Sequence, residues 1–108
     1  MRKEITIGEE TVEMAASAAT PFLFKKLFKR DFLREAQEDQ KSDELYIMLA
    51  FVMASDPNEI LKGNVSEDDF FGWLEKFEYL DLIDALPEVI RLYTKQKKGS
   101  SIPKTPAD

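Results

Sequence analysis

The feature that most constrains the fold is an uninterrupted apolar run at residues 45–54, in the middle of the chain. Ten residues are about half of what a helix needs to cross a bilayer, so the run does not predict a membrane span. Residues 43–55 are apolar on nearly every side of a helical projection, which is typical of a helix packed in more than one direction. We therefore expect a central buried helix over 43–55, capped by Ser42 or Asp43.

The N-terminal residues 3–16 show a different pattern, in which polar and apolar side chains alternate. The apolar members are Ile5, Ile7, Val12 and Met14, with Gly8-Glu9-Glu10 between the two pairs. A period of two with a glycine turn predicts a short β-hairpin. Because an isolated hairpin is marginally stable in water, we expect its apolar face to pack on helices.

Start and stop signals predict four more helices. Thr20-Pro21 starts the first, since threonine caps helices and proline is tolerated at the first position. Ser66, followed by three acidic residues, is an acidic variant of the capping box. Asp84 is a candidate cap for the last helix, which has Pro87 in its first turn and Gly99 as its stop. The expected ranges are about 21–32, 57–62, 67–78 and 85–98.

Two segments have little to bury. Residues 34–43 are polar and predict a linker or a frayed helix end. Residues 99–108 have the composition of a flexible tail. We therefore expect one globular domain over 1–98 and a disordered C-terminal tail. The expected fold class is α+β, mainly α: a short N-terminal β-hairpin packed on a four- to five-helix bundle.

Cysteine and histidine are both absent from the 108 residues. Their absence removes disulfides, cysteine nucleophiles, the usual zinc and haem ligands, and the side chain that most often moves protons near neutral pH. A calcium loop starting at Asp56 fails because Leu61 stands where glycine is needed. The carboxylates at 67–69 diverge on a helix and are better explained as a cap. We expect no catalysis, no metal and no cofactor.

The chain is acidic, with 21 acidic and 15 basic residues and a net charge of −6. This charge repels nucleic-acid phosphates, so we expect no nucleic-acid partner. The N-terminus lacks an apolar stretch of signal-peptide length, so we expect neither export nor membrane insertion. The expected location is the cytoplasm.

Two groups of side chains are candidates for protein binding. The basic residues Lys25, Lys26, Lys29, Arg30 and Arg34 reverse the acidic balance locally; they form either a solvated helix face or a docking surface for an acidic partner, including a second copy of this chain. Twelve aromatics exceed what a minimal core requires, and some of them lie off the clearest core stripes. Most are expected in the core, but any exposed together would form a binding patch. The candidate protein-binding residues are Phe22, Phe24, Lys25, Lys26, Lys29, Arg30, Phe71 and Tyr79.

Several short sequences occur in a familiar order. They are Ala18-Ala19-Thr20-Pro21, Lys26-Leu27-Phe28, Asp31-Phe32-Leu33, Trp73-Leu74 with Phe77, and Ala85-Leu86-Pro87-Glu88-Val89-Ile90. Over about residues 3–95 the chain resembles the tail assembly chaperones of long-tailed, siphovirus-type bacteriophages and prophages of Gram-positive bacteria. Phe22-Leu23-Phe24 departs from that pattern, where a polar or basic residue is expected among the apolar ones.

The resemblance implies a non-enzymatic chaperone in the host bacterial cytoplasm that is not expected in the mature virion. Its implied partners are the tape measure protein, whose apolar helices it coats, the major tail (tube) protein, which it helps to recruit, and further copies of itself as a homo-oligomer. The family often also makes a longer, frameshifted product. Lys97-Lys98 is a hypothetical slip site by its position alone, and the coding DNA would test it.

Two other classes compete with this interpretation. A small helical DNA-binding or antirepressor-type phage regulator would use the basic first helix to approach DNA, and the net charge opposes it. A small hydrolase using Asp, Glu, Ser or Lys lacks a recognisable constellation of residues.

Overall fold

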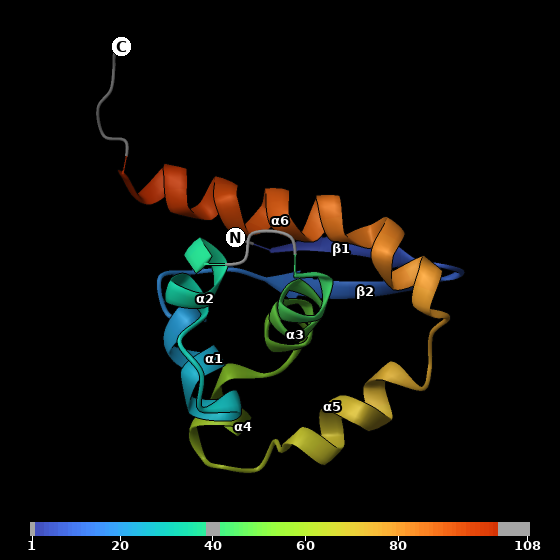
Figure 1. Cartoon of the computed structure of the whole chain (residues 1–108), viewed down its shortest axis with the longest axis horizontal. Helices are drawn as coiled ribbons and strands as arrows, with labels where there is room; N and C mark the ends of the chain where they lie inside the picture. Colours follow the sequence, from blue (N-terminus) through green and yellow to red (C-terminus); the bar gives the residue numbers. More distant parts are fainter. Residues whose placement is uncertain (1, 39–41, 102–108) are drawn as a thin grey trace.

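The computed structural model describes residues 2–38 and 42–101, and residues 96–101 by their backbone alone. Helix α3, Asp43–Ala54, lies at the centre with the other elements around it (Figure 1). Eight of its 12 residues are buried, which requires neighbours on several sides. The Ser42 hydroxyl accepts a hydrogen bond from the Leu45 N–H at 3.2 Å, so Ser42 and not Asp43 is the N-cap.

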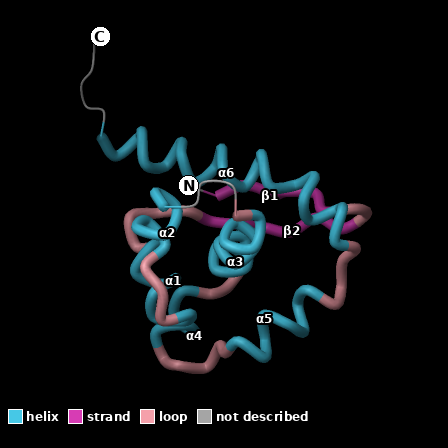
Figure 2. The backbone as a smooth tube through the Cα atoms, viewed as in Figure 1, coloured by secondary structure: helices cyan, strands magenta, loops and turns pink. Residues whose placement is uncertain are grey.

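The hairpin consists of β1, Arg2–Ile7, and β2, Glu10–Ala15, paired antiparallel with Ile5 opposite Val12. Its two-residue turn has Gly8 at φ +64°, a conformation that favours glycine. Ile5 and Met14 are fully buried because β1 packs on α6 and β2 on α3. Figure 2 shows the two strands between these helices.

The helix expected over 21–32 is in fact two helices, α1, Thr20–Phe28, and α2, Phe32–Glu38. Lys29 takes a left-handed conformation, φ +61°, and its N–H bonds the Lys25 carbonyl at 2.8 Å, which ends α1. Phe32 lies beyond this break, as the first residue of α2. The break returns its ring to the core, where it is 2% exposed.

Part of the segment expected as a polar linker or frayed end, 34–43, is thus the rest of α2. The Asp31 carboxylate accepts a hydrogen bond from the Arg34 N–H at 3.2 Å, and the Asp31 carbonyl accepts one from the Glu35 N–H at 3.0 Å. These bonds satisfy the first turn of α2, which explains how a sequence with little to bury is helical.

Helix α4, Pro57–Leu61, is followed by α5, Glu67–Leu74. The helix expected over 67–78 therefore ends four residues early. After Leu74 the hydrogen bonds tighten: the Lys76 N–H bonds Trp73, and the Phe77 N–H bonds Leu74, both at 3.1 Å. This tight turn leads the chain away from α5 and into the last helix.

The last helix, α6, Tyr79–Ser101, begins six residues before the expected start at 85. It also continues beyond the expected stop at Gly99, because glycine can adopt helical backbone angles as well as left-handed ones. Asp84 is therefore inside the helix and not a cap, and Pro87 is an interior proline. Proline bends helices, and Figure 1 shows the first turns of α6 inclined to the remainder. Residues 99–101 of the expected flexible tail are helical, and 102–108 lie outside the described residues.

The fold class is confirmed as α+β, mainly α, although the described residues form six helices and not four to five, because the first predicted helix is divided. A continuous series of aromatic contacts crosses the core. Phe28 touches Phe24 and Phe70 at ring-centroid distances of 5.1 and 5.3 Å, and Phe51 touches Phe70 and Trp73 at 5.3 and 5.4 Å. These rings tie α1, α3 and α5 together.

Candidate protein-binding groove

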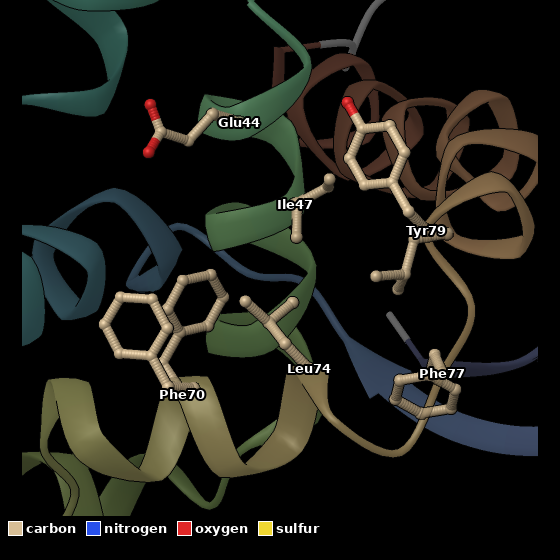
Figure 3. Close-up of a pocket in the computed structure, with 8 residues that line it drawn as sticks. Glu44, Ile47, Phe70, Leu74, Phe77 and Tyr79 are labelled. Atoms are coloured by element: carbon tan, nitrogen blue, oxygen red, sulfur yellow. The ribbon is translucent and has the colours of Figure 1, made fainter.

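An apolar groove of about 400 Å³ lies between α3, α5 and the first turns of α6. We call it the α5 groove, and its walls are Glu44, Ile47, Phe70, Phe71, Leu74, Phe77, Tyr79 and Leu82. Figure 3 shows Ile47 and Leu74 pointing into the same space from α3 and α5, with Phe77 and Tyr79 across it. Because these walls are mostly apolar, the groove can bury an apolar side chain of a binding partner.

The groove exists because α5 is anchored at one face only. Phe70 is buried at 6% exposure, between the rings of Phe28 and Phe51. The next residue, Phe71, points about 100° away on the helix and is 59% exposed. Gly72 adds no side chain beside it, and no atom of the described residues lies within 4 Å of where a Cβ would stand. Phe71 is therefore open to a partner.

The opposite rim belongs to the start of α6. Tyr79 and its neighbour Leu80 are 61% and 72% exposed. Of these two, Tyr79 lines the groove together with Phe71 of α5, and exposed large apolar residues that lie together are typical of protein-binding surfaces. The early start of α6 produces this rim, since it fixes Tyr79 and Leu82 on a helix where the sequence predicted a loop.

The structure separates the four candidate aromatics. Phe71 and Tyr79 meet in the α5 groove, as a patch requires. Phe22 is 74% exposed but lies on α1 and does not line the groove. Phe24 was wrongly placed among possible surface residues: it is fully buried, with its ring 5.1 Å from Phe28 and 5.3 Å from Phe32. The division of the first helix brings Phe32 against it.

The candidate basic residues also divide. Lys25 and Lys26 are exposed on α1, and Lys29 is exposed at its C-cap. Arg30 is half-buried, donates to the Glu35 carboxylate from Nε and Nη2, and donates from Nη1 to the Met48 sulfur at 3.4 Å. The hydrogen bond that Arg30 donates to Glu35 raises the pKa of Arg30, and the same bond lowers the pKa of Glu35. Arg30 therefore holds α2 against α1 and α3 and is not free to dock a partner.

Sequence reasoning missed most of the groove walls. Ile47 and Leu74 lie in apolar helical patterns that predict the core, and neither Leu82 nor Glu44 carries a prediction of its own. A local pattern reports which face of a helix is apolar, but not whether another element covers all of it. The available signal was Phe70-Phe71 followed by glycine, a pair of adjacent rings that one helix face cannot bury together.

A second hollow, about 460 Å³, lies between α2, α3 and α6 and includes Phe32, Leu33, Tyr46 and Tyr93. Burial raises the pKa of the Tyr93 hydroxyl, and the nearby Tyr46 adds to the shift. Gln37 and Thr94 make this hollow more polar than the α5 groove. The α5 groove therefore offers the stronger apolar site.

The acidic clusters have structural explanations. The Ser66 hydroxyl accepts a hydrogen bond from the Asp69 N–H at 3.4 Å, and the Asp69 carboxylate accepts one from the Ser66 N–H at 2.9 Å, which is a complete capping box. The Asp56 carboxylate accepts one from the Asn58 N–H at 2.9 Å and caps α4. Within residues 2–38 and 42–101, no group of three or more metal-ligating side chains gathers.

In that same part of the chain, no helix is both long enough and apolar enough to cross a membrane. No family model, curated protein or solved structure matches this chain.

Proposed function

We propose that this chain is a non-catalytic protein-binding domain that acts as a phage tail assembly chaperone. Its principal client is the tape measure protein, and it helps to recruit the major tail (tube) protein. It acts in the host bacterial cytoplasm and is absent from the mature virion. The observation that carries the proposal is the α5 groove, with Phe71 and Tyr79 exposed on either side of it.

The chemistry of the groove suits an apolar helix as the client. Its aromatic walls supply contact area with few rotatable bonds, which lowers the entropic cost of binding. Residues 67–81 around it carry six carboxylates and one lysine. Such a rim keeps a complex of two apolar surfaces dissolved. The resemblance described above supplies the identity of the client.

A pulldown tests the proposal. Tagged chain is co-expressed with the tape measure and tail tube proteins encoded in the same genome, and the recovered proteins are identified by mass spectrometry. We expect both to be recovered with the wild type, and Phe71→Ser to reduce recovery of the tape measure protein. Leu61→Ser is the matched control, because Leu61 on α4 is also 59% exposed but lies outside the groove. Recovery of neither protein would refute the chaperone proposal.

The alternative function, a DNA-binding or antirepressor-type regulator, draws support from the three exposed lysines of α1. The net charge of −6 opposes it. An electrophoretic mobility assay at low salt separates the two proposals: salt-sensitive retardation of duplex DNA that is lost on charge reversal of the three lysines would favour the regulator.

A further inference from the structure

We propose that, without its client, the α5 groove of one copy is occupied by the solvent face of α1 from a second copy. The inference builds on the protein-binding role proposed for the groove and names its resting occupant. We call the α1 surface the basic face, and it consists of Phe22, Lys25, Lys26 and Lys29. Two unlike surfaces of one chain would then join copies head to tail.

The basic face is one contiguous strip. With about 3.6 residues per turn, Phe22, Lys25 and Lys26 fall within roughly 100° of the helix circumference, opposite the buried residues of α1. Lys29 follows at the C-cap of α1, where its ammonium donates a hydrogen bond to the Lys26 carbonyl at 3.0 Å. All four are exposed, and Phe22 is 74% exposed. None of its lysines forms a salt bridge with another residue in the described part of the chain. The face thus presents one aromatic ring beside three uncompensated positive charges.

The groove presents the complementary surface. Its walls take an aromatic ring, and its volume of about 400 Å³ exceeds that of one phenylalanine side chain. Glu75 and Glu78 are exposed in the turn between α5 and α6, and neither forms a salt bridge within residues 2–38 and 42–101. Glu44 adds a third carboxylate at the α3 wall. Apolar contact and opposite charge therefore both favour pairing of the basic face with the α5 groove.

One chain cannot make this contact with itself. Phe28 faces inward to the Phe70 ring of α5, whereas Phe22 lies on the opposite side of α1. Docking must therefore occur between copies. Because the two surfaces differ, each added copy leaves one face and one groove open, so association continues past the dimer into a ring or an open chain.

This arrangement regulates the client site. A groove filled by a neighbouring basic face is hidden from solvent, which protects its aromatics from nonspecific association. A client helix must displace that neighbour, so client binding and self-association compete for the same surface.

Sedimentation velocity on the full chain tests the inference with two variants. The face variant carries Lys25→Glu, Lys26→Glu and Lys29→Glu; the groove variant carries Phe71→Glu. We expect the wild type to form species larger than a dimer as concentration rises, and each variant to raise the dissociation constant about tenfold or more. The control Lys3→Glu/Lys62→Glu/Lys95→Glu has the same net charge as the face variant. It breaks the Lys3–Glu88 and Lys62–Glu59 salt bridges, but exposed pairs of this kind contribute little to stability, so the control should associate like the wild type.

Mixing provides the decisive result. The face variant keeps a working groove and the groove variant keeps a working face, so an equal mixture should form a complex that stops at two copies. A wild type that stays monomeric at every concentration, a control that dissociates as much as the face variant, or a mixture that forms no complex would each overturn the inference. Far-UV circular dichroism confirms folding, and Phe22→Ser repeats the face test without charge reversal.

Failure here is distinguishable from failure of the proposed function. If no tape measure protein is recovered but the mixed variants pair, self-docking stands and the client identity is wrong. If the tape measure protein is recovered but the chain is monomeric, the chaperone proposal stands and the groove has no resting occupant.

Discussion

At the scale of single residues, Phe22 and Phe24 show how position on one helix decides the role of a side chain. They are two residues apart on α1, yet one is 74% exposed and the other fully buried. Consecutive helical positions turn by about 100°, so residues two apart point in nearly opposite directions. Phe24 therefore contributes to stability, while Phe22 is available for association.

We expect Phe24→Ala to lower the free energy of unfolding by about 3–5 kcal/mol, because it removes a buried ring and leaves a cavity. Phe22→Ala is the matched control and should change it by no more than about 0.5 kcal/mol. Urea titration at a concentration where the chain is monomeric measures both. Equal losses in the two variants would contradict the burial described here.

The Arg30–Glu35 pair makes stability depend on pH. The hydrogen bond from Arg30 lowers the pKa of Glu35 below its ordinary 4.5, so the folded chain binds this proton more weakly than the unfolded chain. The stabilisation is present above pH 4.5 and is lost as pH falls through the lowered pKa. We expect Glu35→Gln to be less stable than wild type at pH 7, with the difference vanishing in acid.

Chemical denaturation from pH 7 down to pH 2.5 measures this difference. Arg30→Gln serves as the partner control. Once the guanidinium is absent, adding Glu35→Gln should lower the free energy of unfolding only slightly further. A difference between wild type and Glu35→Gln that persisted unchanged in acid would show that the pair is not its source.

At the scale of elements, the turn of the hairpin packs closely against the first turns of α6. Gly8 in the turn has φ +64°, and a Cβ there would lie 2.6 Å from the Oδ2 atom of Asp81 on α6. Gly63, after α4, has φ +80°, and in the part of the chain that the structure describes no atom lies within 4 Å of where its Cβ would stand. The two glycines share a left-handed backbone and differ in their surroundings.

We therefore expect Gly8→Ala to destabilise the chain more than Gly63→Ala. Both substitutions incur the left-handed cost of about 1–2 kcal/mol, and Gly8→Ala must also displace Asp81. Thermal unfolding of the two variants measures the difference. In an Asp81→Ala background, the difference in stability between the Gly8→Ala and Gly63→Ala variants should become smaller. A difference of unchanged size would show that the contact with Asp81 is not responsible.

At the scale of the whole molecule, α3 connects every layer. The hairpin, α1, α2, α5 and α6 all contact it. Helix α5 depends on that centre, because Phe70 and Trp73 both place their rings within 5.4 Å of the Phe51 ring. A helix as short as α5 is unstable in isolation, so it stays folded only while it packs on this core.

We expect unfolding to be a single transition. Trp73 is the one tryptophan of the chain, so its fluorescence reports on α5, while circular dichroism at 222 nm reports on all helices. The urea midpoints from the two probes should coincide. Loss of the tryptophan signal at lower urea than the helical signal would show that α5 detaches first.

Local signals in the sequence are sufficient to predict several of the elements. The all-apolar run predicted α3, the period of two and Gly8 predicted the hairpin, and Ser66 with its acidic neighbours predicted the start of α5. Each signal lies within a few residues and depends on backbone hydrogen bonding or on the repeat of one element. Those signals also account for the fold class.

The ends of several helices, and the exposure of individual apolar residues, depend on contacts between segments that are distant in the sequence. The break at Lys29, the burial of Phe24 and the start of α6 at Tyr79 all follow from packing between distant segments. The α5 groove combines three elements, so no single stretch of sequence encodes it. Local patterns indicate which side chains are apolar enough to favour burial. The space available to each side chain depends on how the other elements pack around it.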